Sequence, residues 1–149
     1  MFVTMKIRLL TSIILILSGT IVNSQTIVRP NFGMKSHETL EIDSIKTDGK
    51  TSRIYLVIEN KSPDGNFCAD SNIYILLPQN KKLELITAAG IPECPDSYHF
   101  KTFGEKLRFS LVFPSVPPNV KWIDLIEDCD YPCFSFNTII LDIELNQRI

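Results

Sequence analysis

Residues 106–113 read KLRFSLVF, and this stretch decides the fold. Its large apolar side chains stand at every second position: Leu107, Phe109, Leu111 and Phe113. A period of two residues places them on one face of extended backbone, so the stretch predicts a β-strand with one buried face. Pro114 ends the strand, because proline lacks the amide that a sheet ladder needs.

The same period of two recurs on both sides of this strand, and no segment keeps a helical period for three turns. Further strands are predicted at 40–45, 53–59, 73–77, 83–87, 98–102, 120–126 and 134–145. A slip in the alternation at Ser44 indicates a bulge. An apolar run at 139–141 indicates either burial on both faces or another bulge.

Turn and loop signals separate these strands. Asp48-Gly49-Lys50 and residues 78–81 predict two hairpins, and longer loops are predicted at 60–72 and 88–97. About seven to nine short strands without a crossover helix indicate an all-β fold of two packed antiparallel sheets. We expect an immunoglobulin-like sandwich, and a small barrel is the alternative because it produces the same alternation.

The first 24 residues have the pattern of an export signal. Lys6 and Arg8 precede an apolar run at 9–22, and Val22-Asn23-Ser24 is a suitable cleavage site. The run is shorter than the roughly 20 residues that span a bilayer, although a retained anchor is the alternative. We therefore predict a signal peptide at 1–24 and a single β-sandwich domain at 25–149, with no membrane span after cleavage.

The charge of the chain disfavours polyanionic partners. The sequence holds 15 Lys and Arg against 17 Asp and Glu, for a net charge of −2. Its basic residues are dispersed along the chain, whereas nucleic acid and anionic membranes need them clustered. We expect no nucleic-acid partner.

Four cysteines remain after the signal: Cys68, Cys94, Cys129 and Cys133. An even number in an exported chain predicts two disulfides. Three pairings are possible, and Cys68–Cys94 with Cys129–Cys133 is favoured because residues 130–132 can turn tightly. The spacing does not match the CxxC pairs of zinc or redox sites.

No motif predicts catalysis, a metal or a cofactor. His37 and His99 stand far apart in the sequence, and we expect them at the surface or at strand ends. Glu127, Asp128 and Asp130 form an acidic cluster that a cation would favour, but its spacing fits solubilising charges better. The prediction is a protein that is not an enzyme.

Aromatic residues leave one binding function open. Trp122 and four tyrosines would form a sugar-binding platform if they were exposed together. Packing of Trp122 against the core or a disulfide is the favoured interpretation, as in other sandwiches. Asn60-Lys61-Ser62 also fits a glycosylation sequon, which matters only in a eukaryotic host.

Three segments carry a resemblance to a known group of proteins. They are FPSVPPNVKWIDLIE at 113–127, PNFGMKSHETLEI at 30–42 and FCAD at 67–70. The chain resembles small exported β-sandwich proteins of Bacteroidetes-type bacteria, most of them uncharacterised. The resemblance implies an immunoglobulin-like sandwich in the periplasm or cell envelope and carries no activity or catalytic residues with it.

These expectations combine into one functional hypothesis. The protein is expected to be an exported, non-enzymatic accessory or protein-interaction module that is periplasmic, bound to the cell envelope or secreted. Its expected partner is an envelope protein, because exported sandwiches without a chemical motif usually present binding surfaces. A carbohydrate-binding module is the alternative.

Overall fold

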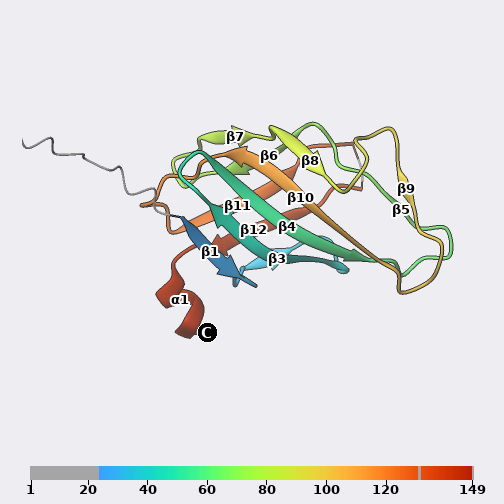
Figure 1. Ribbon diagram of the computed structural model, residues 1–149, viewed down its shortest axis with the longest axis horizontal. Helices are drawn as coiled ribbons and strands as arrows, with labels where there is room; N and C mark the ends of the chain where they lie inside the picture. Colours follow the sequence, from blue (N-terminus) through green and yellow to red (C-terminus); the bar gives the residue numbers. More distant parts are fainter. Residues whose placement is uncertain (1–23, 131, 149) are drawn as a thin grey trace, which may run out of the picture.

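The computed structural model describes residues 24–130 and 132–148 of the 149-residue chain. The predicted signal peptide, apart from Ser24, therefore lies outside the described residues. Within the described part the regular secondary structure is β-strand except for one short helix near the C-terminus (Figure 1). No helix in this part is long and apolar enough to cross a bilayer.

Sheet A has five antiparallel strands in the order β1-β3-β4-β10-β8. Their bounds are β1 (Gln25–Val28), β3 (Leu40–Thr47), β4 (Thr51–Glu59), β10 (Lys106–Pro114) and β8 (Thr87–Ala89). The two longest strands, β4 and β10, pair along their whole length, from Lys106 opposite Glu59 to Pro114 opposite Thr51. The slip predicted at Ser44 is a register shift between β3 and β4.

Sheet B has five antiparallel strands in the order β2-β12-β11-β6-β7. Their bounds are β2 (Met34–Lys35), β12 (Ser135–Ile140), β11 (Trp122–Glu127), β6 (Ile73–Leu76) and β7 (Lys82–Glu84). The remaining elements are the short pair β5 (Asn66–Phe67) and β9 (Tyr98–His99), and the helix α1 (Ile143–Arg148). The prediction of an all-β fold with antiparallel sheets is confirmed.

The two sheets share one hydrophobic core. Alternate residues of their strands point into it, as the period of two predicts: Phe109, Leu111 and Phe113 from β10, and Ile123 and Leu125 from β11, are all buried. Phe134 and Phe136 fill the same core from the last part of the chain. Burying apolar side chains from both layers removes them from water and holds the sheets together.

The prediction of a single strand over 134–145 is wrong at its end. β12 stops at Ile140, and the chain turns into α1, where Asp142 Oδ1 accepts hydrogen bonds from the backbone N–H groups of Glu144 and Leu145 at 2.9 and 3.2 Å. An aspartate that satisfies the first free N–H groups is an N-cap, and it overrides the alternating pattern. The β11–β12 register shifts directly before the apolar run, where Thr138 has a positive φ of 55°. This irregularity is the bulge that the sequence offered as one of two explanations.

Two other predicted strands are shorter or divided. The stretch 83–87 contains the end of β7 in sheet B and the start of β8 in sheet A, so the predicted loop at 88–97 begins too early. The stretch 98–102 keeps only β9, because Glu105 Oε2 accepts bonds from the N–H groups of Lys101 and Thr102 and closes a turn there. β1 and β2 were not predicted.

The strands end at two different ends of the body. The loop end, where β5 and β9 lie in Figure 1, is formed by the connections 60–72, 90–105 and 128–134. The turn end is formed by the turns at 48–50 and 78–81, the connection 115–121 and α1. Candidate functional sites can therefore lie at the loop end, at the turn end or on the outer face of either sheet.

Candidate functional site

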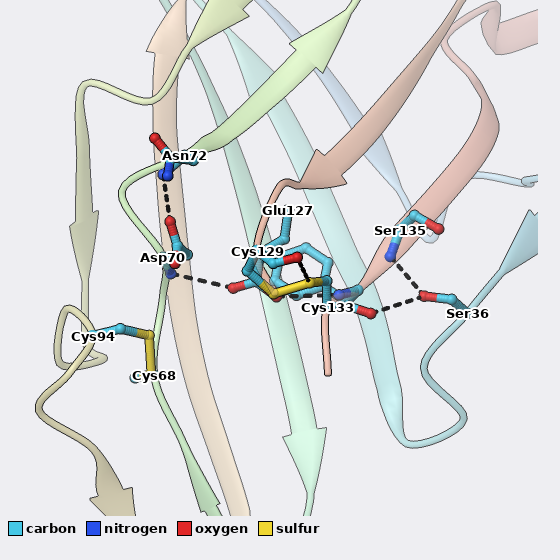
Figure 2. The surroundings of a disulfide bond; sticks show 10 residues. Ser36, Cys68, Asp70, Asn72, Cys94, Glu127, Cys129, Cys133 and Ser135 are labelled. Atoms are coloured by element: carbon cyan, nitrogen blue, oxygen red, sulfur yellow. Dashed lines mark hydrogen bonds between the residues drawn. A yellow bond between two sulfur atoms is a disulfide. The ribbon is translucent and has the colours of Figure 1, made fainter. Parts of the chain in front are cut away.

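Both disulfides lie at the loop end. The Sγ atoms of Cys68 and Cys94 are 1.97 Å apart, and those of Cys129 and Cys133 are 1.91 Å apart. The cysteines thus lie at bonding distance in the pairing that the sequence favours, and none of them is free. One bridge joins two different connections of the loop end, and the other closes the β11–β12 connection on itself (Figure 2).

Main-chain bonds support the first bridge on both sides. The N–H of Ala69 donates to Pro92 O at 2.9 Å, and the N–H of Cys94 donates to Ala69 O at 3.0 Å. The β5–β9 pair continues this contact further along the same two connections. The connections 60–72 and 90–105 therefore form one tied unit instead of two independent loops.

Glu127 joins the third connection to this unit. It ends β11 and is only 7% exposed, yet its two oxygens accept backbone bonds from different segments (Figure 2). Oε1 accepts from Asp70 N at 3.2 Å, and Oε2 accepts from Phe134 N at 3.1 Å. Burial raises the pKa of the Glu127 carboxyl, while these two N–H groups lower it by favouring the charged form.

A cavity of about 360 Å³ lies between the tied connections. Phe67 and Phe134 form its apolar part, with ring centroids 6.3 Å apart, and Asp70 and Glu127 add carboxylates. Cys68, Cys94 and Cys129 also line it, so both disulfides border the same space. The loop end is thus a concave surface with a fixed shape.

His37 lies at the edge of this cavity, not at a free surface. Its ring meets Phe67 edge to face at 5.8 Å, and its buried Nδ1 has no hydrogen-bond partner among the described residues. Burial, together with the charge of Lys35, lowers the pKa of the imidazole and so favours its neutral form. His99 is exposed on β9 and does not line the cavity, so the fold does not bring the two histidines together.

The predicted acidic cluster is divided by the fold. Glu127 points inward and is committed to backbone donors, whereas Asp128 and Asp130 are exposed. Within 24–130 and 132–148 there is no group of three or more His, Cys, Asp or Glu residues arranged to hold a metal ion. A buried Glu127 was not predicted, because its sequence neighbours Asp128 and Asp130 made the segment look solvated.

The aromatic residues do not form the predicted arrangement. Trp122 was expected to pack against the core or a disulfide, but it lies half-buried on the outer face of β11, opposite Ile123 and Leu125, at the end of the strand away from both disulfides. Tyr74 shares that outer face, but Lys82 Nζ lies 4.1 Å from its ring centroid and covers it. Tyr131 lies outside the described residues. A platform of stacked aromatic rings is therefore not assembled from Trp122 and Tyr74 alone.

Asn60, the acceptor of the possible sequon, is a structural residue. It is only 4% exposed, and its Nδ2 donates to Thr102 O at 2.9 Å while its Oδ1 accepts from Ser62 N at 3.1 Å. Gly65 must lack a side chain here, because a Cβ would lie 2.0 Å from Asn60 Oδ1. This asparagine therefore stabilises the tip of the loop end, and its side chain is not presented as an acceptor for a glycan.

The carboxylates and sulfur atoms of the loop end are engaged within the protein itself. The carboxylates satisfy backbone donors, and the sulfur atoms lie in bridges, so these groups hold the shape of the cavity. Comparison with protein-family models, with curated proteins and with solved structures finds no match for this chain. The function must therefore be inferred from the geometry described above.

Proposed function

We propose that the protein is an exported, non-enzymatic accessory module of the cell envelope that binds another protein through its loop end. The observation that carries this proposal is the concentration of both disulfides and the Glu127 bonds around one cavity. Loops that are fixed by a scaffold are the usual place for binding residues, and prior fixing lowers the entropy lost on association. The two disulfides also support an oxidising destination.

The strand order supports an immunoglobulin-like sandwich. That fold has the order A-B-E-D in one sheet and G-F-C in the other, with an added C′ strand in some members. Here β3-β4-β10-β8 follows the first order, and β12-β11-β6-β7 follows the second with C′ included. The loop end then corresponds to the B–C, D–E and F–G connections, which cluster at one end of such a fold.

An exposed aromatic residue is the best anchor for a partner. Phe103, in the connection 90–105, is 70% exposed, and Lys61 Nζ lies 5.4 Å from its ring centroid. Aromatic side chains dominate the binding energy of many interfaces. An exposed aromatic side chain on a fixed loop loses little conformational entropy when a partner binds. We expect the partner to cover Phe103 and the mouth of the cavity.

Site-specific photocrosslinking in the native host tests this proposal. A photoreactive phenylalanine replaces Phe103 in one strain and Val28 in another, because Val28 is similarly exposed at 68% but lies on β1. We expect one discrete envelope-protein adduct from position 103, which added wild-type protein competes away and a Phe103→Ser protein does not. Equal adducts from both positions, or none from position 103, would contradict the proposal.

Export is tested separately in the same cells. The intact mass of the recovered protein should correspond to a chain that begins at Gln25. Reduction of the two disulfides should raise this mass by the hydrogen atoms that their four sulfur atoms regain. A mass that retains residues 1–24 or free thiols would contradict export to an oxidising compartment without bearing on the crosslink itself. The two parts of the proposal therefore fail independently.

A further inference from the structure

The outer face of sheet A collects basic side chains that are dispersed in the sequence. Strand alternation turns Arg53 on β4 and Arg108 on β10 away from the core, because their neighbours Ile54 and Phe109 are buried. Lys46 on β3 is paired with Arg53, and Lys106 is two residues from Arg108 on the same face. The fold therefore produces a basic cluster that the sequence did not predict.

This face is hollowed into a groove. A depression of about 520 Å³ is walled by Arg29, Lys106 and Arg108 together with Glu41 and Asp43. A smaller depression of about 230 Å³ shares Asp43 and Arg108 with it and also contains Tyr55 and Ser110. Because the two depressions share walls, an elongated ligand can occupy both.

Three arginines of this face form no ion pair with an acidic residue among the described residues. The four ion pairs among the described residues are Lys35–Glu41, Lys61–Glu59, Lys121–Asp142 and Arg148–Glu144. None of them uses Arg29, Arg53 or Arg108. Lys46 and Arg53 even face each other directly across β3 and β4, where like charges repel and reduce stability. An anion between them would remove this repulsion.

The spacing suits a linear ligand with separated charges. Lys46 and Arg53 form one pair of cations, and Lys106 and Arg108 on β10 form a second pair. Arg53 lies four residues along β4 from Val57, which is the strand partner of Arg108. Four residues of a strand span about 13 Å. Between the pairs lie the half-buried ring of Tyr55, with Lys46 Nζ 5.1 Å from its centroid, and the Ser110 hydroxyl.

Asp43 distinguishes among anionic ligands. A DNA phosphate backbone or an acidic peptide side chain presents no hydroxyl to this carboxylate in the shared wall of the groove and would be repelled by it. A sugar chain with carboxylates carries hydroxyls between its charges, and these can donate to Asp43. A peptide also cannot add to the sheet here, because β4 and β10 already have neighbours on both sides.

We propose that the outer face of sheet A binds an acidic glycan, with its carboxylates at the two cation pairs and a sugar ring near Tyr55. Guanidinium groups bind carboxylates through two parallel hydrogen bonds, which makes Arg53 and Arg108 the strongest contacts. This site is on a different surface from the loop end, so the inference does not depend on the protein partner proposed above.

Binding of the purified protein to polygalacturonate, a carboxylated glycan, tests the proposal by titration calorimetry. Neutral dextran and poly-glutamate are the comparison ligands. We expect binding to polygalacturonate that weakens with added salt, and a Kd that rises roughly tenfold for each of Arg53→Gln and Arg108→Gln. Lys50→Gln and Lys81→Gln each remove one charge from a turn outside the groove, as each arginine variant removes one, and should leave the Kd unchanged.

Variants that keep the charge separate the site from the stability of the fold. Arg53 Nη1 donates to Ser110 Oγ at 3.0 Å, so Arg53→Gln is accompanied by Arg53→Lys and by a thermal melt of each protein. A folded Gln variant with a raised Kd, partly restored in the Lys variant, supports the site. No binding by the wild-type protein, equal loss in the Lys50 and Lys81 controls, or poly-glutamate binding as tight as that of the glycan would overturn the proposal.

Discussion

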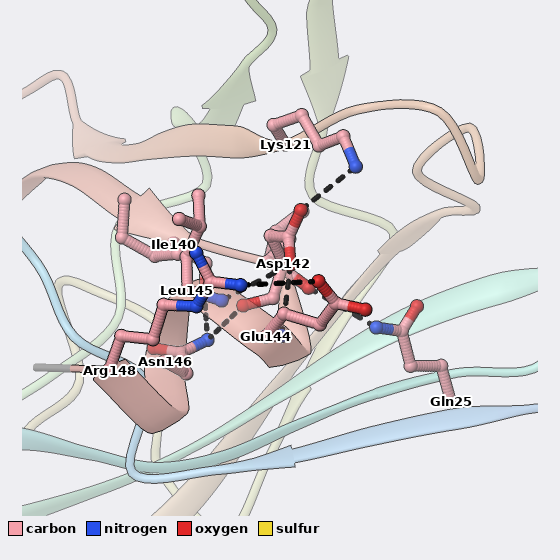
Figure 3. Close-up of polar contacts among 9 residues, drawn as sticks. Gln25, Lys121, Ile140, Asp142, Glu144, Leu145, Asn146 and Arg148 are labelled. Carbon is pink, nitrogen blue, oxygen red and sulfur yellow. Dashed lines mark hydrogen bonds and ion pairs between the residues drawn. The ribbon is translucent and has the colours of Figure 1, made fainter.

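The two ends of the molecule are held by different kinds of contact. At the loop end, bonds join residues far apart in the sequence, with separations of 26 for Cys68–Cys94 and 57 for Asp70–Glu127. At the turn end, the caps of the Asp48 turn and of α1 are local, because Asp48 Oδ1 accepts from the N–H groups of Lys50 and Thr51 and Asp142 caps α1 (Figure 3). Long-range hydrogen bonds also occur there, from Gln25 to Leu141 and from Lys121 to Asp142, but both disulfides lie at the loop end.

Under the proposed function the two ends have different tasks, and this difference serves them. Turns closed by their own residues need only connect strands, and local bonds suffice for that. Loops that bind a partner must keep one conformation although they have little regular structure, and cross-links between distant segments supply that order. The comparison predicts that damage to the loop end lowers stability more than equivalent damage to the turn end.

The largest effect should come from the bridge between two connections. Replacing Cys68 and Cys94 together by alanine should lower the free energy of unfolding by about 3 kcal/mol, because the unfolded chain regains the freedom of a long loop. Replacing Cys129 and Cys133 should cost about 2 kcal/mol, because that loop is short. Urea unfolding of the three oxidised proteins measures both values. Equal losses, or a larger loss for the second pair, would contradict the expectation that a bond between distant segments contributes more to stability than a local one.

Sequence reasoning performs differently at the two ends for the same reason. The turn at Asp48-Gly49-Lys50 and the slip at Ser44 follow from local pattern, and the structure has both. The strand KLRFSLVF was also predicted correctly and lies inside sheet A as β10, because its alternating sequence follows the alternation of buried and outward side chains. At the C-terminus the same reasoning fails, because the Asp142 cap competes with an alternating pattern that looks like a strand.

The two proposed binding surfaces could not be predicted because they depend on the register of the strands. His37 and Asp70 border one cavity only because three connections converge there, and Arg29 and Arg108 share a groove only because β1, β3, β4 and β10 are neighbours. The even cysteine count was the one local signal of the loop end. It indicated cross-links but not which surfaces they would shape.

A medium effect should come from the buried asparagine of the loop end. Asn60→Ala leaves the Thr102 carbonyl and the Ser62 N–H without their partner and should lower the free energy of unfolding by about 2 kcal/mol. Asn72→Ala is the matched control, because Asn72 is exposed in the same connection and should change stability by less than about 0.5 kcal/mol. Denaturant unfolding of both variants compares their free energies of unfolding. Similar losses of stability in the two would contradict the structural role of Asn60.

The smallest effect is a difference in how the two ends respond to acid. Burial raises the pKa of Glu127 above its unfolded value, so its contribution to stability is present below the unfolded pKa and is lost as the pH rises through the folded pKa. Hydrogen bonds, first that of Lys121, lower the pKa of Asp142, so its contribution is present above the unfolded pKa and is lost as the pH falls through the folded pKa. The two carboxyls therefore give stability profiles of opposite slope.

Single variants isolate each slope between about pH 3 and pH 7. The difference in unfolding free energy between wild type and Glu127→Gln should decrease as the pH rises, whereas that between wild type and Asp142→Asn should increase. Lost hydrogen bonds shift each curve by a constant, so the slope alone reports the titration. Because the sites lie at opposite ends, the double variant should equal the sum of the single variants within about 0.5 kcal/mol. Slopes of the same sign would mean that Glu127 is not held in a buried environment, and the cross-linked architecture of the loop end would then lose its central bond.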